Sequence, residues 1–386
     1  GGTLTATTDG TGLATFTNLS ITGLIGSRTL TFTSGILTAA TSTAINITTG
    51  ARSKLTITTQ PSASATSDVA FATQPVVRIE DSGGNPVSEN LTGVTASLAS
   101  GAVTLGGTLL ASTNAGGVAS FTDLKITGAT GARTLLFAAT GLTSATSSAV
   151  TLGAGSATQL TVTTQPSASA ANAVAFAAQP AIQLRDASTN PVATAGVVIT
   201  AAIASGGVAL GGTLTATTDG TGLATFTNLA ITGVVGSRTL TFTSGILTAA
   251  TSTAINITAG LANHLSITTE PSTIATDNIV FGVQPVIQLR DVSNNAVSQA
   301  GVAVTAEIST GTGTLATTVT VLTDASGVAT FTDLKINGAG ALTVTFSATS
   351  LTSAASASFT VTQTPASLAI QIQPAGATSP LAFTTQ

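Results

Sequence analysis

Side chains that could take part in catalysis are few in this sequence and lie far apart. The chain has one histidine, His264, and no cysteine. His264 stands at a place where neighbouring copies of a repeat carry Lys54 and Gln159, which is typical of the exposed start of a strand and not of a general base. A histidine-dependent triad or a thiolate nucleophile therefore cannot be assembled from this chain.

Three aspartates occupy the same place in a recurring segment, and they are the best candidates for a binding site. Asp81, Asp186 and Asp291 each lie in a turn, and Asp81 is followed by Asn85. Asp81 and Asn85 are possible calcium ligands, but residues 82–84 add at most hydroxyl or carbonyl oxygens. We therefore favour a turn capped by the aspartate, with calcium as the alternative. No second carboxylate is expected to face them across a cleft, as a glycosidase would need.

Lysine–asparagine crosslinks and glycosylation are weakly supported. Lys125 and Lys335 are matched by Ser20 and Ala230 in the other copies, so a crosslink could form in only two of four. Asn-x-Ser/Thr motifs arise readily by chance in a threonine-rich chain. They occur at Asn18, Asn46, Asn90 and Asn256.

Threonine alternates with apolar residues in segments such as 3–5 and 29–33. This pattern resembles an ice-binding face, but it also follows from a strand with one face buried, and no short solenoid period accompanies it. We prefer the strand interpretation. The sequence thus assigns no catalytic, cofactor-binding or metal-binding residue.

The elements that position these side chains belong to a long internal repeat. The segment 71–87, FATQPVVRIEDSGGNPV, returns at 176–192 and at 281–297, with a spacing of 105 residues each time. Phe383 begins the motif again at 383–386, after a spacing of 102 residues. A period of this length indicates an array of separate domains.

The repeat predicts the following domain boundaries: 1–52 as the second half of a unit, 53–157, 158–262 and 263–366 as complete units, and 367–386 as the start of another. Residues 1–50 and 211–260 differ at only four positions. This near-identity indicates duplication of a two-unit block. Because both ends fall inside a unit, we expect the sequence to be part of a longer array.

Each unit is expected to be an all-β, immunoglobulin-like antiparallel sandwich. Threonine and other β-branched residues favour strands, and 40 Gly and 11 Pro mark turns between them. Hairpin turns are predicted at 8–11, 114–117 and equivalent places, with Asp-Gly supplying positive dihedrals. Residues 28–33 alternate as one strand, and Pro75 marks a bend or a change of sheet. Twelve of the 13 Phe recur at three places per unit, which predicts a core.

Charge and hydropathy exclude several classes of function. Only 6% of residues are charged and the net charge is −4, which leaves no basic surface for nucleic acid or for a membrane. A hydrophobic content of 43% is enough for a packed core. The longest apolar stretch, 196–210, is too interrupted to span a bilayer.

The motifs together resemble a known family. A first strand ending in Gln-Pro, then Phe-x-x-Gln-Pro, Asp-x-x-x-Asn-Pro-Val and a Gly-Val-Ala-x-Phe strand are similar to the tandem bacterial immunoglobulin-like domains of large surface proteins of the invasin and intimin type. The resemblance covers the whole chain. It implies an exported stalk or fibre protein in which the domains act as spacers.

The sequence therefore predicts a structural, non-enzymatic protein at the cell surface or outside the cell, without a cofactor. Exposed sheet edges normally carry lysine or other charges that prevent pairing, and this chain has few. We expect self-association into a filament or sheath, with strand completion between successive chains as one variant. The alternative is an adhesin or glycan-binding module that uses loops at the ends of the sandwiches.

Overall fold

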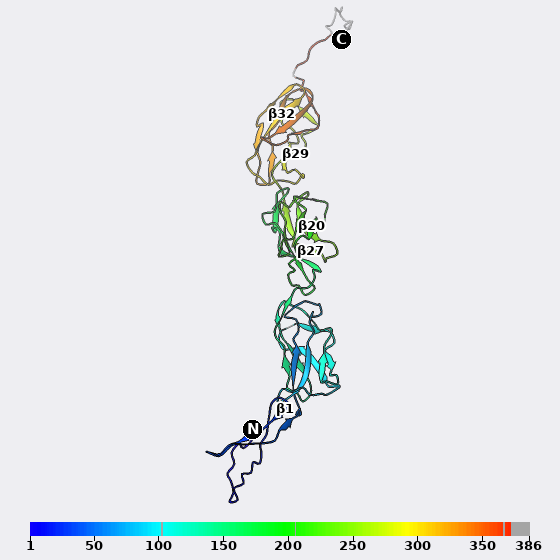
Figure 1. Ribbon diagram of the computed structural model, residues 1–386. Helices are drawn as coiled ribbons and strands as arrows, with labels where there is room; N and C mark the ends of the chain where they lie inside the picture. The colour runs from blue at the N-terminus through cyan, green and yellow to red at the C-terminus, as the bar shows by residue number, and fades with distance from the viewer. Residues whose placement is uncertain (102, 205, 366, 372–386) are drawn as a thin grey trace, which may run out of the picture.

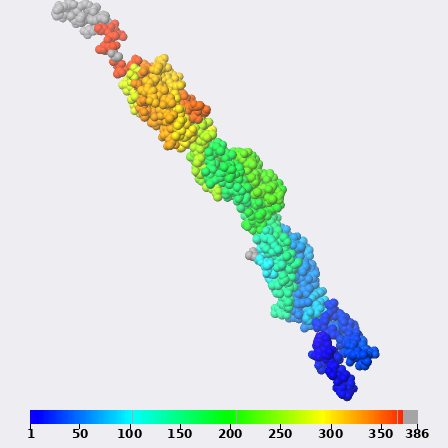
Figure 2. Space-filling model, turned by 90° about the vertical axis from the view of Figure 1, so that its left-hand side faces the viewer, coloured from blue at the N-terminus to red at the C-terminus, as the bar shows by residue number. Residues whose placement is uncertain are grey.

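The computed structural model describes residues 1–101, 103–204, 206–365 and 367–371. Within these ranges all regular structure is β, and the strands group into an amino-terminal segment and three units that follow one another along a rod (Figures 1 and 2). The Phe383 motif and most of the predicted segment 367–386 lie outside the described residues.

Each unit has the same order of short strands. The amino-terminal segment contains β1 (Gly26–Arg28), β2 (Thr31–Phe32), β3 (Ala40–Thr41) and β4 (Ile45–Ile47). Unit 1 contains β5 (Arg52–Thr59), β6 (Ser64–Thr66), β7 (Val76–Asp81), β8 (Gly93–Leu98), β9 (Thr104–Gly106), β10 (Leu110–Ser112), β11 (Val118–Ser120), β12 (Lys125–Thr127), β13 (Gly131–Arg133), β14 (Leu135–Ala138), β15 (Ala145–Thr146) and β16 (Val150–Gly153).

Unit 2 repeats this order strand for strand, and in unit 3 one long strand, β37 (Gly340–Ser347), takes the place of both β13 and β14. Unit 2 contains β17 (Gln159–Thr164), β18 (Ser169–Ala171), β19 (Ala181–Arg185), β20 (Val198–Ile203), β21 (Ala209–Gly211), β22 (Thr215–Thr217), β23 (Leu223–Thr225), β24 (Ala230–Thr232), β25 (Gly236–Arg238), β26 (Leu240–Thr243), β27 (Ala250–Thr251) and β28 (Ile255–Thr258). Unit 3 contains β29 (His264–Thr269), β30 (Ile274–Thr276), β31 (Val286–Arg290), β32 (Ala303–Thr310), β33 (Gly313–Ala316), β34 (Thr320–Leu322), β35 (Val328–Thr330), β36 (Lys335–Gly338), β37 (Gly340–Ser347), β38 (Ala354–Ala355) and β39 (Phe359–Thr362).

A unit is a sandwich of two sheets. In unit 1 one layer is the sheet β11-β7-β5, and the other contains two hydrogen-bonded groups, β10-β8-β14-β15 and β13-β16-β6; β9 and β12 form a separate pair. In unit 3 the equivalent strands form one continuous sheet, β30-β39-β37-β32-β34. The first strand of unit 1 divides at Pro61, because β5 pairs with β7 whereas β6 runs parallel to β16. This arrangement is an immunoglobulin-like sandwich, so the predicted fold class is confirmed.

Each unit has its own apolar core between its two sheets. Buried side chains form three separate clusters, one in each unit. The recurring phenylalanines of the three units lie in these cores, as predicted, and Phe121 packs on Phe137 with 5.2 Å between ring centroids. Phe16 and Phe32 of the amino-terminal segment pack on each other but are only half-buried. Phe359, the one phenylalanine outside the three recurring places, is also buried and packs edge-on against Phe281.

Two local predictions were wrong. The alternating stretch 28–33 is not one strand, because β1 pairs with β4 whereas β2 pairs with β3. The first hairpin turn, predicted at 8–11, also begins one residue later: the Asp9 carbonyl accepts a hydrogen bond from Gly12 N–H at 3.0 Å. The turn predicted at 114–117 is confirmed, because the Asn114 carbonyl accepts from Gly117 N–H at 2.9 Å. Gly12, with φ +85°, is the left-handed residue of the turn, so its fourth position and not the Asp-Gly pair requires glycine.

The amino-terminal segment has almost the same sequence as 211–260 but is less buried. Ile21 is 36% exposed, whereas its equivalent Ile231 is fully buried. In unit 2 the strands β17 to β20 contribute the opposing half of the core around Ile231, including Ile182 and Ile199. The same residues are therefore core residues only where both halves of the sandwich are present.

No helix in the described part of the chain is long and apolar enough to cross a membrane.

Candidate functional site: the joints between units

The recurring aspartate segment forms a tight turn that closes on itself. In unit 3 the Asp291 carboxylate accepts hydrogen bonds from the backbone N–H groups of Ser293, at 2.9 Å, and Asn295, at 2.8 Å. The Asn295 side chain amide donates to the other carboxylate oxygen at 2.9 Å. Both side chains are buried. The predicted aspartate-capped turn is confirmed.

The asparagine of this turn binds the preceding unit, which the sequence did not predict. Asn295 Nδ2 donates to the carbonyl of Gly233 at 2.9 Å, and Asn295 Oδ1 accepts from the Val235 N–H at 3.0 Å. Gly233 and Val235 lie in the loop between β24 and β25, which we call the joint loop of unit 2. One side-chain amide thus makes a two-point contact with the backbone of another unit, as a neighbouring strand would.

The same contact occurs at all three junctions. At the first joint, between the amino-terminal segment and unit 1, the asparagine is Asn85, and at the second joint, between units 1 and 2, it is Asn190. Their contacts are Asn85 to Gly23 O (2.8 Å) and Ile25 N (2.8 Å), and Asn190 to Gly128 O (2.9 Å) and Thr130 N (3.0 Å). The distances agree within 0.2 Å across the three joints.

The aspartate of each turn binds the connection between the two units. The Asp291 Oδ2 atom accepts from the backbone N–H of Gly260 at 2.9 Å, and at the third joint it also accepts from Asn172 Nδ2 at 2.9 Å. Gly50 and Gly155 donate in the same way to Asp81 and Asp186, each at 2.8 Å. At the third joint a Cβ on Gly260 would lie 2.6 Å from the carbonyl oxygen of Asn172, so the contact needs glycine.

An arginine supports the joint loop from within its own unit. In unit 2, Arg238 donates through Nη2 to the carbonyl of Val234 at 3.0 Å and through Nη1 to that of Ser237 at 2.7 Å. Arg133 binds the carbonyls of Ala129 and Ala132 in unit 1 in the same way. The loop is therefore held in shape before the next unit docks on it.

Hydrogen bonds keep the joint aspartates ionised. The amide of Asn85 and the N–H of Gly50 lower the pKa of Asp81 to about 2. Burial by itself raises the pKa of Asp291, but hydrogen bonds from Gly260, Asn295 and Asn172 outweigh it and lower that pKa to about 2. The pKa of Asp186 is also lowered, because hydrogen bonds outweigh its burial.

His264 and Lys125, also considered from the sequence, make none of the joint contacts described above. His264 begins β29 and is half-buried, with Nε2 3.4 Å from Asn294 Oδ1. Lys125 forms an ion pair with Asp68 at 2.7 Å, on the surface of unit 1. The oxygens of Asp81 that could bind calcium accept hydrogen bonds from N–H groups instead. Within the described residues, no three His, Cys, Asp or Glu side chains gather where a metal could bind.

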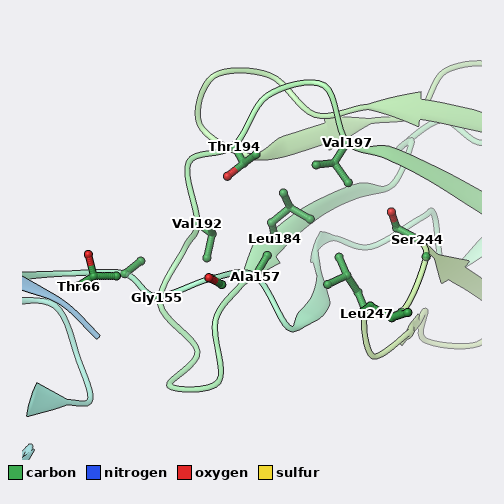
Figure 3. Close-up of a pocket in the computed structure, with 13 residues that line it drawn as sticks. Thr66, Gly155, Ala157, Leu184, Val192, Thr194, Val197, Ser244 and Leu247 are labelled. Atoms are coloured by element: carbon green, nitrogen blue, oxygen red, sulfur yellow. The ribbon is translucent and has the colours of Figure 1, made fainter. Parts of the chain in front are cut away.

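A groove lies beside the second joint (Figure 3). It has a volume of about 600 Å³ and is lined by the connection 154–157 and by apolar side chains of unit 2, among them Leu184, Val192 and Val197. Ile246, in the loop between β26 and β27, lies on its rim and is fully exposed. The groove is therefore an uncharged, apolar hollow next to a joint.

Sequence reasoning identified the turn but missed its partner. Asn85, Asn190 and Asn295 recur at the same place, as do the joint-loop glycines Gly23, Gly128 and Gly233. The two sets keep the same separation in every copy, because 62 residues divide each glycine from the asparagine that binds it. That constant separation was the available signal, although it could not reveal a contact by itself.

The chain is similar in fold to several solved structures. One is FdeC, an Escherichia coli adhesin, with 17% identity, a TM-score of 0.35 and coverage of 82% of this chain and 100% of that one. Another is the D00-D0 domain of intimin, with 14% identity, a TM-score of 0.28 and coverage of 53% and 98%. The surface layer protein SbsC, domains 1–6, shows 12% identity, a TM-score of 0.26 and coverage of 93% and 48%.

The immunoglobulin-like fold that the resemblance to invasin- and intimin-type domains implied is observed in the three units themselves. No protein-family model and no curated protein sequence matches the chain.

Proposed function

We propose that the chain is a segment of an extracellular stalk on a cell surface, in which the sandwiches are spacers held end to end by the Asp–Asn joint. The repetition of this two-point contact at all three joints carries the proposal. Contacts between domains of one chain are usually small and allow relative motion. A specific contact that recurs unchanged favours a rod of fixed direction. The proposal gives the chain no catalytic role, and it keeps the domain boundaries predicted from the repeat.

The test is to remove the joint asparagines together. We expect small-angle X-ray scattering of the native chain to give the dimensions of an extended rod. The variant with Asn85→Ala, Asn190→Ala and Asn295→Ala should bend at each joint and shorten its mean end-to-end distance, while the three sandwiches stay folded. Asn337→Ala, at an exposed residue of β36 that is in none of the three joints, is the control. A native chain that bends as freely as the triple variant would refute the proposal.

We also propose that such stalks associate side by side through an uncharged threonine-rich face. In unit 2 the β20 residue Thr200 pairs with Thr215 of β22 on one side and with Thr243 of β26 on the other. The outer face around them carries Thr, Val and Ala and no charge: Val198, Thr200, Ala202, Thr215, Thr217, Thr241, Thr243 and Thr251. β22 is an edge strand without lysine, which leaves its outer backbone groups open to pairing.

A single lysine in this face tests the association. Thr200→Lys should weaken self-association about tenfold, because a charge would have to be desolvated at each contact. Sedimentation velocity over a range of concentrations measures the effect, and Ala177→Lys, which adds the same charge at an exposed site off this sheet, is the control. A native chain that stays monomeric at high concentration contradicts this part of the proposal alone.

A second candidate is an adhesin or glycan-binding role of the loops at the ends of the sandwiches. The groove at the second joint, with the exposed Ile246 on its rim, favours it. Binding of a host-surface extract or a glycan array to the native chain, lost on Ile246→Asp, would support this candidate over a purely structural one.

A further inference from the structure

The three joints share the Asp–Asn contact but differ in what surrounds it. At the third joint Asn172 is 2% exposed and makes two contacts at once. Its Oδ1 accepts from the N–H of Gly233 in the joint loop of unit 2, at 2.8 Å, and its Nδ2 donates to Asp291 of unit 3, at 2.9 Å. Asn172 therefore ties the joint loop to the turn that docks on it.

The second joint has a shorter side chain at this place. Ser67 takes the position of Asn172 and accepts from the N–H of Gly128 at a longer distance, 3.3 Å. Among the described hydrogen bonds none connects Ser67 with Asp186, the equivalent of Asp291. A cavity of about 190 Å³, lined by Ser67, Asp186 and Gly155 among others, lies where the asparagine amide would reach. The second joint thus has one contact fewer and a hollow in its place.

Two further features distinguish the second joint, the first of them from the first joint only and the second from both neighbours. At the first joint Arg52 and Glu89 form an ion pair of 2.7 Å. The equivalent residues of the second joint are Ala157 and Thr194, which line the open groove. The turn of the second joint also contains Thr189 at φ +65°, where the other turns have Gly84 and Asn294. A β-branched residue is strained in that conformation, whereas glycine and asparagine tolerate it.

We propose that the second joint is the compliant point of the rod and that the third joint is locked by Asn172. The inference rests on the proposed stalk function and adds where the stalk bends. Residues 1–50 and 211–260 differ at four positions only, and the joint loops of the first and third joints share their glycine, Gly23 and Gly233, and carry apolar residues at the next two positions, Leu24 and Ile25 against Val234 and Val235. The differences between the joints therefore repeat with the two-unit block. A unit equivalent to unit 2 is fixed to the unit that follows it, and these two units move as one body.

The chain has no native cysteine, so spin labels attach only at cysteines introduced by substitution. Ser97, Ala202 and Glu307 are exposed and occupy the same place in β8, β20 and β32. Cysteines at Ser97 and Ala202 span the second joint, and cysteines at Ala202 and Glu307 span the third. In the full chain we expect the pulsed dipolar distance distribution across the second joint to be about twofold wider than that across the third.

Exchanging the side chains at positions 67 and 172 should exchange the widths of the two distance distributions. Ser67→Asn is expected to narrow the distribution across the second joint, and Asn172→Ser to widen that across the third. Ser64→Asn, at an exposed site on β6, should change neither. Equal widths, or widths that do not respond to the two exchanges, overturn the inference. Narrow distributions at both joints would leave the stalk proposal standing, whereas wide distributions at both would contradict it as well.

Discussion

At the scale of single residues, equivalent positions of the repeat carry different side chains on the same backbone conformation. One position of the repeat is Asp68 in unit 1, Ala173 in unit 2 and Asn278 in unit 3. The backbone is left-handed at all three residues, with φ of 67°, 63° and 60° respectively. Aspartate and asparagine tolerate this conformation because their side chains bond locally, and alanine does not. Unit 2 therefore carries a strained residue that its neighbours avoid.

Ala173→Asn is expected to stabilise unit 2 by about 1 kcal/mol, since it removes the cost of a left-handed alanine. The measurement is thermal unfolding of the full chain, followed for the transition of unit 2. Ala177→Asn, which is exposed and does not have a positive φ, should leave the midpoint unchanged. A midpoint that stays the same for both variants contradicts the explanation from strain.

At the scale of elements, the hairpin turn keeps one residue in every copy, the glycine at its fourth position. The hairpin turn in unit 2 ends at Gly222, with φ +78°, and a Cβ there would lie 1.8 Å from the carbonyl oxygen of Val192. The turn sequence varies before this glycine, as in Asn114 to Gly117 and Asp324 to Gly327, but its fourth residue does not. The backbone conformation and a close neighbour fix that residue.

Gly222→Ala should therefore destabilise unit 2 by about 2 kcal/mol or more, because the new methyl group meets backbone that cannot move aside. Gly220→Ala is the matched control in the same turn: its Cβ would have no atom within 4 Å. Chemical denaturation of the full chain measures both. If Gly220→Ala costs as much as Gly222→Ala, the close approach to Val192 is not the cause.

Much of each element could be predicted from the sequence. Period-two alternation, the Gln-Pro at the end of the first strand and the spaced phenylalanines are local signals, and they place β5 and the core correctly. Pro75 is not a bend within a strand, because β7 begins at Val76 and residues 71–75 form no strand. The division of residues 28–33 between two sheets could not be predicted, because each half pairs with a strand distant in the chain. The left-handed glycine was misplaced because Asp-Gly is the stronger local signal for a hairpin turn.

At the scale of the whole molecule, the ionisation of the joint aspartates affects how firmly successive units are held together. Asp81 and Asp291 have a pKa of about 2 in the docked turn, against an ordinary value of 3.8. A lowered pKa means that the docked state favours the ionised form, so its contribution is complete above the ordinary pKa and is lost as the pH falls toward the lowered one. These two groups thus make the joints insensitive to pH near neutrality and weaker in acid.

We expect the rod to keep its stiffness from pH 8 to about pH 5 and to lose it progressively between about pH 4 and pH 2. Scattering or dipolar distance distributions across the third joint, recorded over this range, would follow the change. Asp291→Asn should remove most of the pH dependence at that joint. If the native joint stays narrow down to pH 2, the ionised carboxylate does not hold it.

The sequence by itself determined the repeat, the β-sandwich and the residues of the cores, since alternation and turn chemistry act between near neighbours in the chain. Only the tertiary structure decided which residues the Asp–Asn turn contacts outside its own unit. Asn295 binds Gly233, which lies 62 residues earlier and in another unit, and local sequence pattern does not specify which backbone a side-chain amide will bind. Only the tertiary structure likewise shows that Asn172 reaches the aspartate of the following unit, whereas a cavity lies between the shorter Ser67 and Asp186.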